Sequence, residues 1–349
     1  MDGLKKSYQC GFPQYNDSSD GHSVKNIKNN TIYVIDDIVA INSEMLTVKE
    51  KIKRAATSDS SVLIYGKTGT GKEMVAQSIH NCSKRHSNPF ISVNCASIPS
   101  TLLESNLFGT VKGSFTGAED REGLFQAADQ GTLFLDEINS MEPMMQVKIL
   151  KAIEEKRIRK VGGTKQIPLD VKIIAALNQD PMELIKEGKL RKDLFFRLSV
   201  IEIDIPQLKK RKDDIEYLTK YFIDYYNEDM GKNIKRVSKE VKKVFEEYDW
   251  PGNVRELKNV IEGAFNNTKN DIIGIDDIPE RLLNQRTNRQ SYISIEFDAN
   301  NIGLQEYLEE CERRIIFDTI EKNDGNMAAA ARDLRISRQL LYYKLKRQL

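Results

Sequence analysis

A glycine-rich run holds the residues of this sequence that are best suited to chemistry. It reads Gly66-Lys67-Thr68-Gly69-Thr70-Gly71-Lys72 and lies between an apolar segment and a helical stretch, Glu73–His80. Glycines let backbone N–H groups wrap phosphates, a helix N-terminus adds partial positive charge, and Lys72 can reach the outer phosphates. The general pattern ends in a Ser or Thr that holds Mg²⁺, whereas Glu73 stands here. A glycine-rich turn without a nucleotide is the alternative, but the strand–loop–helix context favours ATP binding.

A pair of carboxylates follows the apolar run Thr132–Leu135. Asp136 is suited to holding Mg²⁺, directly or through water, and Glu137 is suited to orienting an attacking water. An Asp-Glu pair after apolar residues is often only a solvated strand end. Its position downstream of Lys72 favours the functional interpretation.

The segment Gly113–Ala118 has an unusual composition. Two glycines bracket Phe115-Thr116, which suits a mobile loop tip better than a core strand. An ATPase rarely needs such a tip unless it pushes on another molecule. The alternative is a buried phenylalanine in an ordinary turn.

The C-terminal residues 325–349 concentrate positive charge, with six basic residues against one acidic residue. Neutralisation of DNA phosphates requires such a local excess. The spacing predicts two short helices joined by a turn, with Ser337 capping the second helix. We expect Arg338, Gln339 and Tyr342 to contact bases, and Lys344 and Arg347 to contact phosphates. The alternative is a basic amphipathic helix that is only solvated.

The elements that must position these residues alternate along the first part of the chain. Helical stretches separate apolar runs of strand length, which predicts a doubly wound parallel sheet. The runs are Ser61–Tyr65, Phe90–Val93, Thr132–Leu135, Val171–Ala176 and Val200–Ile205. After Pro206 the apolar-run strands stop, and helical spacing predicts a small helical domain. The expected organisation is a polar tail (1–35), an α/β core (36–205), the helical domain (206–283), a linker (284–302) and the helix-turn-helix unit (303–349).

Composition limits the class of protein. The chain is 40% hydrophobic and 30% charged with a net charge of +1, so no global field drives it to nucleic acid or a membrane. Its four cysteines lack metal-binding or redox spacing, which suits reduced thiols. The longest apolar runs are too short for a membrane span, and residues 1–30 are polar rather than signal-like. These features predict a cytoplasmic protein with no membrane partner.

The sequence resembles a known family in several of these motifs. Gly113-Ser114-Phe115-Thr116-Gly117-Ala118 is similar to the GAFTGA loop of NtrC-type AAA+ activators of sigma-54 RNA polymerase, departing at Ser114. Residues 102–109 resemble the family segment that carries this loop, and Glu73 agrees with the family's phosphate loop. The resemblance implies an AAA+ P-loop ATPase with a helical lid and an all-α Fis-type helix-turn-helix domain. It also implies ATP and Mg²⁺ as cofactors, assembly into a hexameric ring, and contact of Phe115 and Thr116 with sigma-54.

The resemblance also assigns roles to five further residues: Asn94, Asn178, Arg191, Arg197 and Arg255. Asn94 matches the asparagine that restrains the catalytic glutamate, and Asn178 matches sensor I, a reader of the γ-phosphate. The family usually has Thr at Leu177. Arg191 and Arg197 match the arginine fingers that reach a neighbouring subunit's ATP, and Arg255 matches sensor II of the lid. Without the resemblance, Asn178 would be read as a cap or turn residue, and either finger as a surface ion pair.

The C-terminal motif resembles Fis-type units, which act as dimers and imply a palindromic enhancer. The C-terminal half is similar to arginine-utilisation regulators of Gram-positive bacteria. Family members usually carry a sensory domain, whereas about 35 residues precede the ATPase here. We therefore expect control by a partner protein, control by expression level, or a shortened form of a longer protein. Two other functions stay open: a DNA-binding regulator whose AAA+ domain is a nucleotide-dependent oligomerisation switch, and an AAA+ remodeller of another class.

Overall fold

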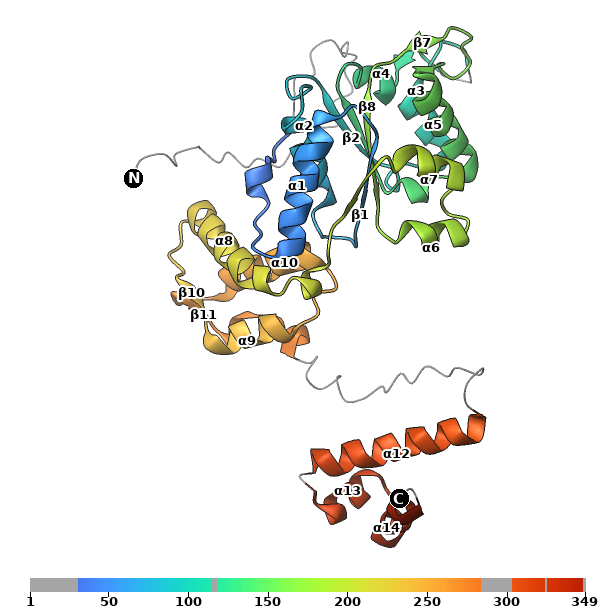
Figure 1. Cartoon of the computed structure of the whole chain (residues 1–349). Coiled ribbons are helices and arrows are strands. Elements are labelled where there is room, and N and C mark those ends of the chain that lie inside the picture. Colours follow the sequence, from blue (N-terminus) through green and yellow to red (C-terminus); the bar gives the residue numbers. More distant parts are fainter. Residues whose placement is uncertain (1–30, 115–117, 284–302, 324, 348–349) are drawn as a thin grey trace. The chain divides into compact units, whose positions relative to one another are not determined.

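The computed structural model describes residues 31–114, 118–283, 303–323 and 325–347. The chain divides into two compact units, 1–283 and 284–349, shown in Figure 1. Each unit is described by itself below.

The first unit is built on a five-stranded parallel sheet with the order β2-β5-β8-β1-β9. Its strands are β1 (Val62–Tyr65), β2 (Phe90–Asn94), β5 (Thr132–Asp136), β8 (Lys172–Leu177) and β9 (Ile201–Asp204). Each strand coincides with one of the apolar runs. Because the strands are parallel, all their carboxyl ends meet at one edge of the sheet, where Asn94 lies opposite Asp136. The predicted doubly wound sheet is confirmed.

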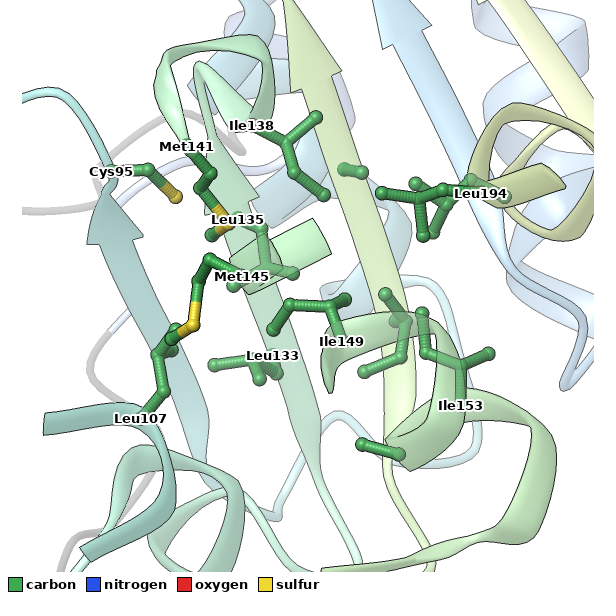
Figure 2. Packing of buried hydrophobic residues seen from close by; sticks show 14 of the residues in the cluster. Cys95, Leu107, Leu133, Leu135, Ile138, Met141, Met145, Ile149, Ile153 and Leu194 are labelled. Carbon is green, nitrogen blue, oxygen red and sulfur yellow. The ribbon is translucent and has the colours of Figure 1, made fainter. Parts of the chain in front are cut away.

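Alternating side chains of the strands pack into two separate apolar layers. On one face, Leu133, Leu135 and Ile173 pack against helices α3 (Ser100–Phe108), α5 (Pro143–Glu155) and α7 (Lys192–Leu198). Figure 2 shows this layer, with Met145, Ile149 and Ile153 of α5 above the strands. On the other face, side chains such as Ile64 and Phe134 pack against α1 (Ser43–Thr57) and α2 (Lys72–Asn81). The sheet is therefore held between two helical layers.

Short elements complete this part of the unit. They are η1 (Ile35–Asp37), β3 (Gly109–Thr110), β4 (Arg121–Glu122), α4 (Leu124–Ala127), η2 (Ile138–Ser140), β6 (Arg157–Ile158), β7 (Ile167–Pro168), α6 (Pro181–Lys186) and η3 (Leu208–Lys210). The ordered contacts begin before the expected domain start at residue 36, because the backbone N–H groups of Ile32 and Tyr33 both donate to Gln77 Oε1, at 2.9 and 3.0 Å.

The helical lid consists of α8 (Asp213–Met230), α9 (Lys239–Glu247), α10 (Asn253–Asn267) and η4 (Ile275–Asp277). Trp250, the only tryptophan of the chain, is buried in its core. The structure adds one detail to the expected all-helical domain. Two two-residue strands, β10 (Arg236–Val237) and β11 (Ile272–Ile273), pair in parallel where the chain turns between helices.

The second unit contains α12 (Leu304–Lys322), α13 (Met327–Asp333) and α14 (Arg338–Arg347). Its core is small, with Ile316, Ala330, Ala331 and Leu341 buried together. Alanines at the centre let the two short helices approach closely. Throughout the described part of the chain, no helix is both long and apolar enough to cross a membrane.

Candidate active site and DNA-binding unit

The glycine-rich run lies between the carboxyl end of β1 and the start of α2, as its pattern indicates. Gly69 and Gly71 have φ values of 80° and 105°, in the left-handed region that favours glycine. Gly71 precedes α2 without a side-chain cap, and a Cβ atom on it would meet nothing within 4 Å. The N-terminus of α2 therefore faces open space, as an anion-binding helix end must.

A buried cation and a partly buried carboxylate face each other beside this loop. Lys72 Nζ donates to the Gly66 carbonyl oxygen at 3.0 Å. Burial lowers the pKa of Lys72, and the charge of Asp136 opposes that shift. Burial likewise raises the pKa of Asp136, and the Lys72 ammonium opposes it. A bound phosphate would favour charged Lys72, and a bound cation would favour ionised Asp136.

Three further predicted residues lie at the carboxyl ends of strands: Asn94 is the last residue of β2, Glu137 follows β5, and Asn178 follows β8. Asn94 Oδ1 accepts a hydrogen bond from the backbone N–H of Ala96 at 2.9 Å. Glu137 has a left-handed φ of 52°, an unfavourable conformation that is typical of functional sites. Asn178 Oδ1 accepts a hydrogen bond from Asn139 Nδ2 at 3.4 Å. The preceding residue, Leu177, accepts a hydrogen bond from Gly66 N–H through its carbonyl, which places Asn178 next to the glycine-rich loop. The sheet thus lines up Asn94, Asp136, Asn178 and the glycine-rich loop in strand order.

The residues of the glycine-rich loop and the sheet edge fit a nucleoside triphosphate with Mg²⁺. The open helix start and the glycine backbone supply donors for phosphate oxygens, and Lys72 supplies the charge. Within the described ranges, no cluster of three or more His, Cys, Asp or Glu side chains could hold a metal ion. Proteins usually bind Mg²⁺ through one or two carboxylates together with substrate phosphates. Asp136 is the carboxylate so placed.

The lid brings one predicted and one unpredicted residue to the phosphate loop. Arg255, the predicted sensor II, is exposed, and its backbone N–H donates to the Gly69 carbonyl at 3.3 Å. Asn253, two residues earlier, is buried; its Nδ2 donates to the Thr68 carbonyl at 2.9 Å, and its Oδ1 accepts from Leu208 N–H at 2.9 Å. Asn253 begins α10 directly after Trp250-Pro251-Gly252, and the Thr68 carbonyl that it contacts lies 185 positions away in the sequence.

A buried ion pair also joins the loop to the lid. Arg211 Nη2 donates to the Thr70 carbonyl at 3.3 Å, and Arg211 Nη1 lies 3.7 Å from Asp214 Oδ2. Asp214 Oδ1 accepts from the backbone N–H groups of Ile41 and Asn42, at 2.7 and 2.9 Å. The phosphate loop, helix α8 and the segment before α1 therefore meet at this pair. No local pattern in the sequence marked either residue.

The two predicted arginine fingers make contacts elsewhere in the chain. Arg191 occupies the N-cap position of α7, is exposed, and forms a two-point ion pair with Asp193 whose shorter contact is 2.7 Å. Arg197 Nη2 donates to the Ile153 carbonyl at 3.4 Å. Arg197 also lines a cavity of about 710 Å³ with Ser61 and Val171, which precede β1 and β8. This cavity is at the amino ends of the strands, opposite the phosphate loop.

The described residues on either side of Phe115-Thr116-Gly117 are joined by backbone hydrogen bonds. Strands β3 and β4 pair antiparallel, and Gly113 N–H donates to the Ala118 carbonyl at 3.2 Å. Ser114 packs against Gly162, where an added Cβ atom would lie 2.4 Å from the Ser114 Cβ. The predicted sigma-54 contacts, Phe115 and Thr116, lie outside the described residues.

In the C-terminal unit, α13 and α14 form the predicted helix-turn-helix. Arg335 has a left-handed φ of 52° in the turn, and Ser337 Oγ accepts from Leu340 N–H at 3.1 Å. Arg338, Gln339 and Tyr342 are exposed on α14, with the Arg338 guanidinium 5.8 Å from the centre of the Tyr342 ring. Lys344 pairs with Glu312 of α12 rather than pointing free into solvent. The side chain of Arg347 lies outside the described residues.

Three protein families match successive parts of the chain. The sigma-54 interaction domain matches residues 38–204, and the AAA+ ATPase lid domain matches residues 209–293. The Fis family of bacterial regulatory proteins matches residues 307–347. The three matched segments follow the sheet, the lid and the helix-turn-helix in order.

Individual relatives agree with this division. The transcriptional activator RocR of Bacillus subtilis is 45% identical over 92% of this chain and 70% of its own length. The regulatory protein AtoC of Escherichia coli is 39% identical over 88% of this chain and 67% of its own. A signal-transduction and transcriptional-control protein of Clostridium beijerinckii is 42% identical, and there the match spans 50% of the relative. The crystal structure of NtrX from Brucella abortus in complex with ATP superposes with a TM-score of 0.65, 30% identity, and coverage of 89% of this chain and 68% of NtrX. The chain belongs to the sigma-54-dependent transcriptional activators, with an AAA+ ATPase domain, its lid and a Fis-type helix-turn-helix domain.

Proposed function

We propose that the chain hydrolyses ATP and uses the energy to remodel sigma-54 RNA polymerase while bound to upstream DNA. One observation carries the proposal. The glycine-rich loop, Asp136 and Asn178 meet at one sheet edge, and the same unit carries the Gly-Ser-Phe-Thr-Gly-Ala loop. An ATPase site and an output loop on one unit are what a remodelling enzyme requires.

The residues of the sheet edge divide the work of hydrolysis. The backbone of residues 66–71 and Lys72 hold the phosphates, and Glu73 follows where other P-loops place a hydroxyl. Glu137 orients the attacking water, and Asn94, on the neighbouring strand, restrains Glu137. Asn178 and Arg255 contact the γ-phosphate side of the nucleotide. Mg²⁺, held by Asp136, would neutralise charge that develops on the phosphoryl group.

Arg191 and Arg197 act on the nucleotide of a neighbouring subunit. Their contacts within the chain are with Asp193 and Ile153, and Arg197 lies toward the amino ends of the strands. Arginine fingers that act on a neighbouring subunit's nucleotide require a ring, which we propose to be a hexamer. In GTPases such a finger supplies roughly 10³–10⁵ in rate.

Hydrolysis is transmitted to sigma-54 through Phe115 and Thr116. The pairing of β3 with β4 on either side of this segment supports the proposal. Phosphate contacts at the sheet edge favour one position of the loop, and loss of the γ-phosphate releases it.

The C-terminal unit holds the ring at an upstream site. Exposed Arg338, Gln339 and Tyr342 suit base contacts in the major groove, and Arg347 suits a phosphate. Helix α12 exposes Leu304, Leu308 and Ile315 at helical spacing. This stripe supports a dimer that reads a palindromic enhancer. We place the chain, sigma-54 RNA polymerase and the upstream DNA together in the cytoplasm.

A mixing experiment tests the ATPase part of the proposal. ATP turnover should rise steeply with protein concentration as rings form, and Lys72→Ala should abolish it. Glu137→Gln and Arg191→Ala should each be inactive alone, because one lacks the base and the other the finger. Mixed rings pair an intact finger with an intact site in some interfaces and should regain measurable turnover. ATP turnover by Arg191→Ala at the wild-type rate would show that Arg191 is not an arginine finger for a neighbouring subunit. Turnover that is independent of concentration would contradict ring assembly.

A further inference from the structure

The lid holds three consecutive carbonyl oxygens of the phosphate loop. The Thr68 carbonyl accepts from Asn253 Nδ2 at 2.9 Å, and the Gly69 carbonyl accepts from Arg255 N–H at 3.3 Å. The Thr70 carbonyl accepts from Arg211 Nη2 at 3.3 Å. The donors come from the start of α10 and the turn before α8, two separate parts of the lid. The lid thus contacts the backbone of the loop.

These contacts determine where the loop's N–H groups point. In a trans peptide the C=O and the following N–H point in opposite directions. Fixing the carbonyls of Thr68 and Thr70 toward the lid therefore aims the N–H groups of Gly69 and Gly71 away from it. The N–H of Thr70 closes a turn onto the Lys67 carbonyl at 3.3 Å. Donors that are fixed before binding cost no ordering entropy when the phosphates arrive.

Gly69 lets the lid approach this closely. A Cβ atom on Gly69 would lie 2.2 Å from the Gly252 carbonyl oxygen of the lid. The backbones of the loop and the lid are therefore in direct contact. A displacement of the lid cannot leave the loop unaffected.

Asn253 is the residue on which this contact depends most. It is 1% exposed and has a left-handed φ of 52°. Its amide connects Leu208 N–H, at the entry to the lid, to the Thr68 carbonyl. A strained conformation of a buried residue persists only where its surroundings require it. We propose that the lid preorganises the phosphate loop through these carbonyls, with Asn253 as a positioning residue for nucleotide binding. The inference rests on the proposed nucleotide site and adds a residue to it.

The test compares two asparagines whose side-chain amides each join a backbone N–H to a backbone carbonyl; Asn253 Nδ2 also donates to the Pro251 carbonyl at 3.3 Å. Asn253→Gly removes the amide and suits the left-handed backbone. Asn227→Ala removes an amide that also joins one N–H and one carbonyl, both of Ile234 at 2.8 Å, entirely within the lid. The affinity for a fluorescent non-hydrolysable ATP analogue is measured for both variants and the wild type. Fluorescence of the single Trp250, in the lid core, reports whether the lid is folded.

We expect Asn253→Gly to bind the analogue roughly tenfold more weakly, equivalent to about 1.4 kcal/mol, with the lid folded. Asn227→Ala should bind like the wild type. Wild-type affinity in Asn253→Gly, or an equal loss in both variants, would overturn the inference. Absence of binding by the wild type would refute the proposed function and the inference with it.

A second measurement needs no variant and therefore does not depend on whether Asn253→Gly folds. The Leu208 amide is hydrogen-bonded to Asn253 Oδ1, so its hydrogen exchange in the wild type should slow when the analogue binds. An unchanged exchange rate at saturating analogue would contradict the coupling.

Discussion

Replacing Arg211 with methionine should destabilise the ATPase unit by about 3 kcal/mol, because the change leaves a buried charge without its partner. Arg211 is 2% exposed and Asp214 is fully buried. Breaking such a pair costs about 3–5 kcal/mol. Two features place this pair at the lower end of that range. The charged groups lie 3.7 Å apart, and Asp214 keeps its two hydrogen bonds from Ile41 and Asn42.

Urea unfolding followed by Trp250 fluorescence measures this change, since Trp250 lies in the lid that Arg211 anchors. A matched control is Lys242→Met, which breaks a pair with Glu216 at 2.7 Å in which the side chains are 45% and 65% exposed. The control should cost under about 1 kcal/mol. The double variant Arg211→Met/Asp214→Asn removes both charges and keeps the acceptor for Ile41, so it should regain most of the lost stability. If Arg211→Met costs no more than Lys242→Met, the buried pair does not stabilise the unit as argued.

Three further predictions concern other parts of the molecule. Burial lowers the pKa of His80 to about 4, below its ordinary value of about 6.5. As the pH falls, His80 therefore takes up a proton in the unfolded chain before it does so in the folded chain. The free energy of unfolding should fall by about 3 kcal/mol as the pH drops from 7 to 4. Unfolding curves across this range should show a smaller loss for His80→Gln, and an equal loss would exclude His80 as the cause. Ser114→Ala should leave ATP turnover unchanged and raise the free energy of unfolding by up to about 1 kcal/mol, because the buried hydroxyl has no hydrogen-bond partner among the described residues. A lower free energy of unfolding in this variant would show that the hydroxyl is hydrogen-bonded. Leu308→Glu, on the exposed stripe of α12, should convert dimers to monomers in sedimentation and weaken binding to a palindromic site; an unchanged dimer would place the interface elsewhere.

The sequence predicted the features that depend on local pattern. Each of the five strands coincides with an apolar run, and the phosphate loop follows the first of them because glycine and helix-start chemistry are local. Asp136 and Asn178 lie at one edge because the carboxyl ends of parallel strands meet there, but Asn178 was assigned to the site only through the family resemblance.

The remaining features depend on contacts between distant parts of the chain. Asn253 and Arg211 donate hydrogen bonds to the phosphate loop across 185 and 141 positions of the sequence. Nothing in the sequence around either residue indicates that the phosphate loop is its partner. The pairing of Lys344 with Glu312 also depends on how two helices pack, whereas charge alone suggested a phosphate contact for Lys344. Side-chain identity at a single position does not specify such pairings.

Strand opening at a supercoiled sigma-54 promoter would show whether the chain remodels the polymerase. Purified chain, sigma-54 polymerase and template with the upstream site are mixed with ATP or a non-hydrolysable analogue. We expect opening with ATP only, and loss of opening in Phe115→Ala while ATP turnover persists. Opening by Phe115→Ala at the wild-type rate would contradict this expectation, as would wild-type turnover of ATP without any opening.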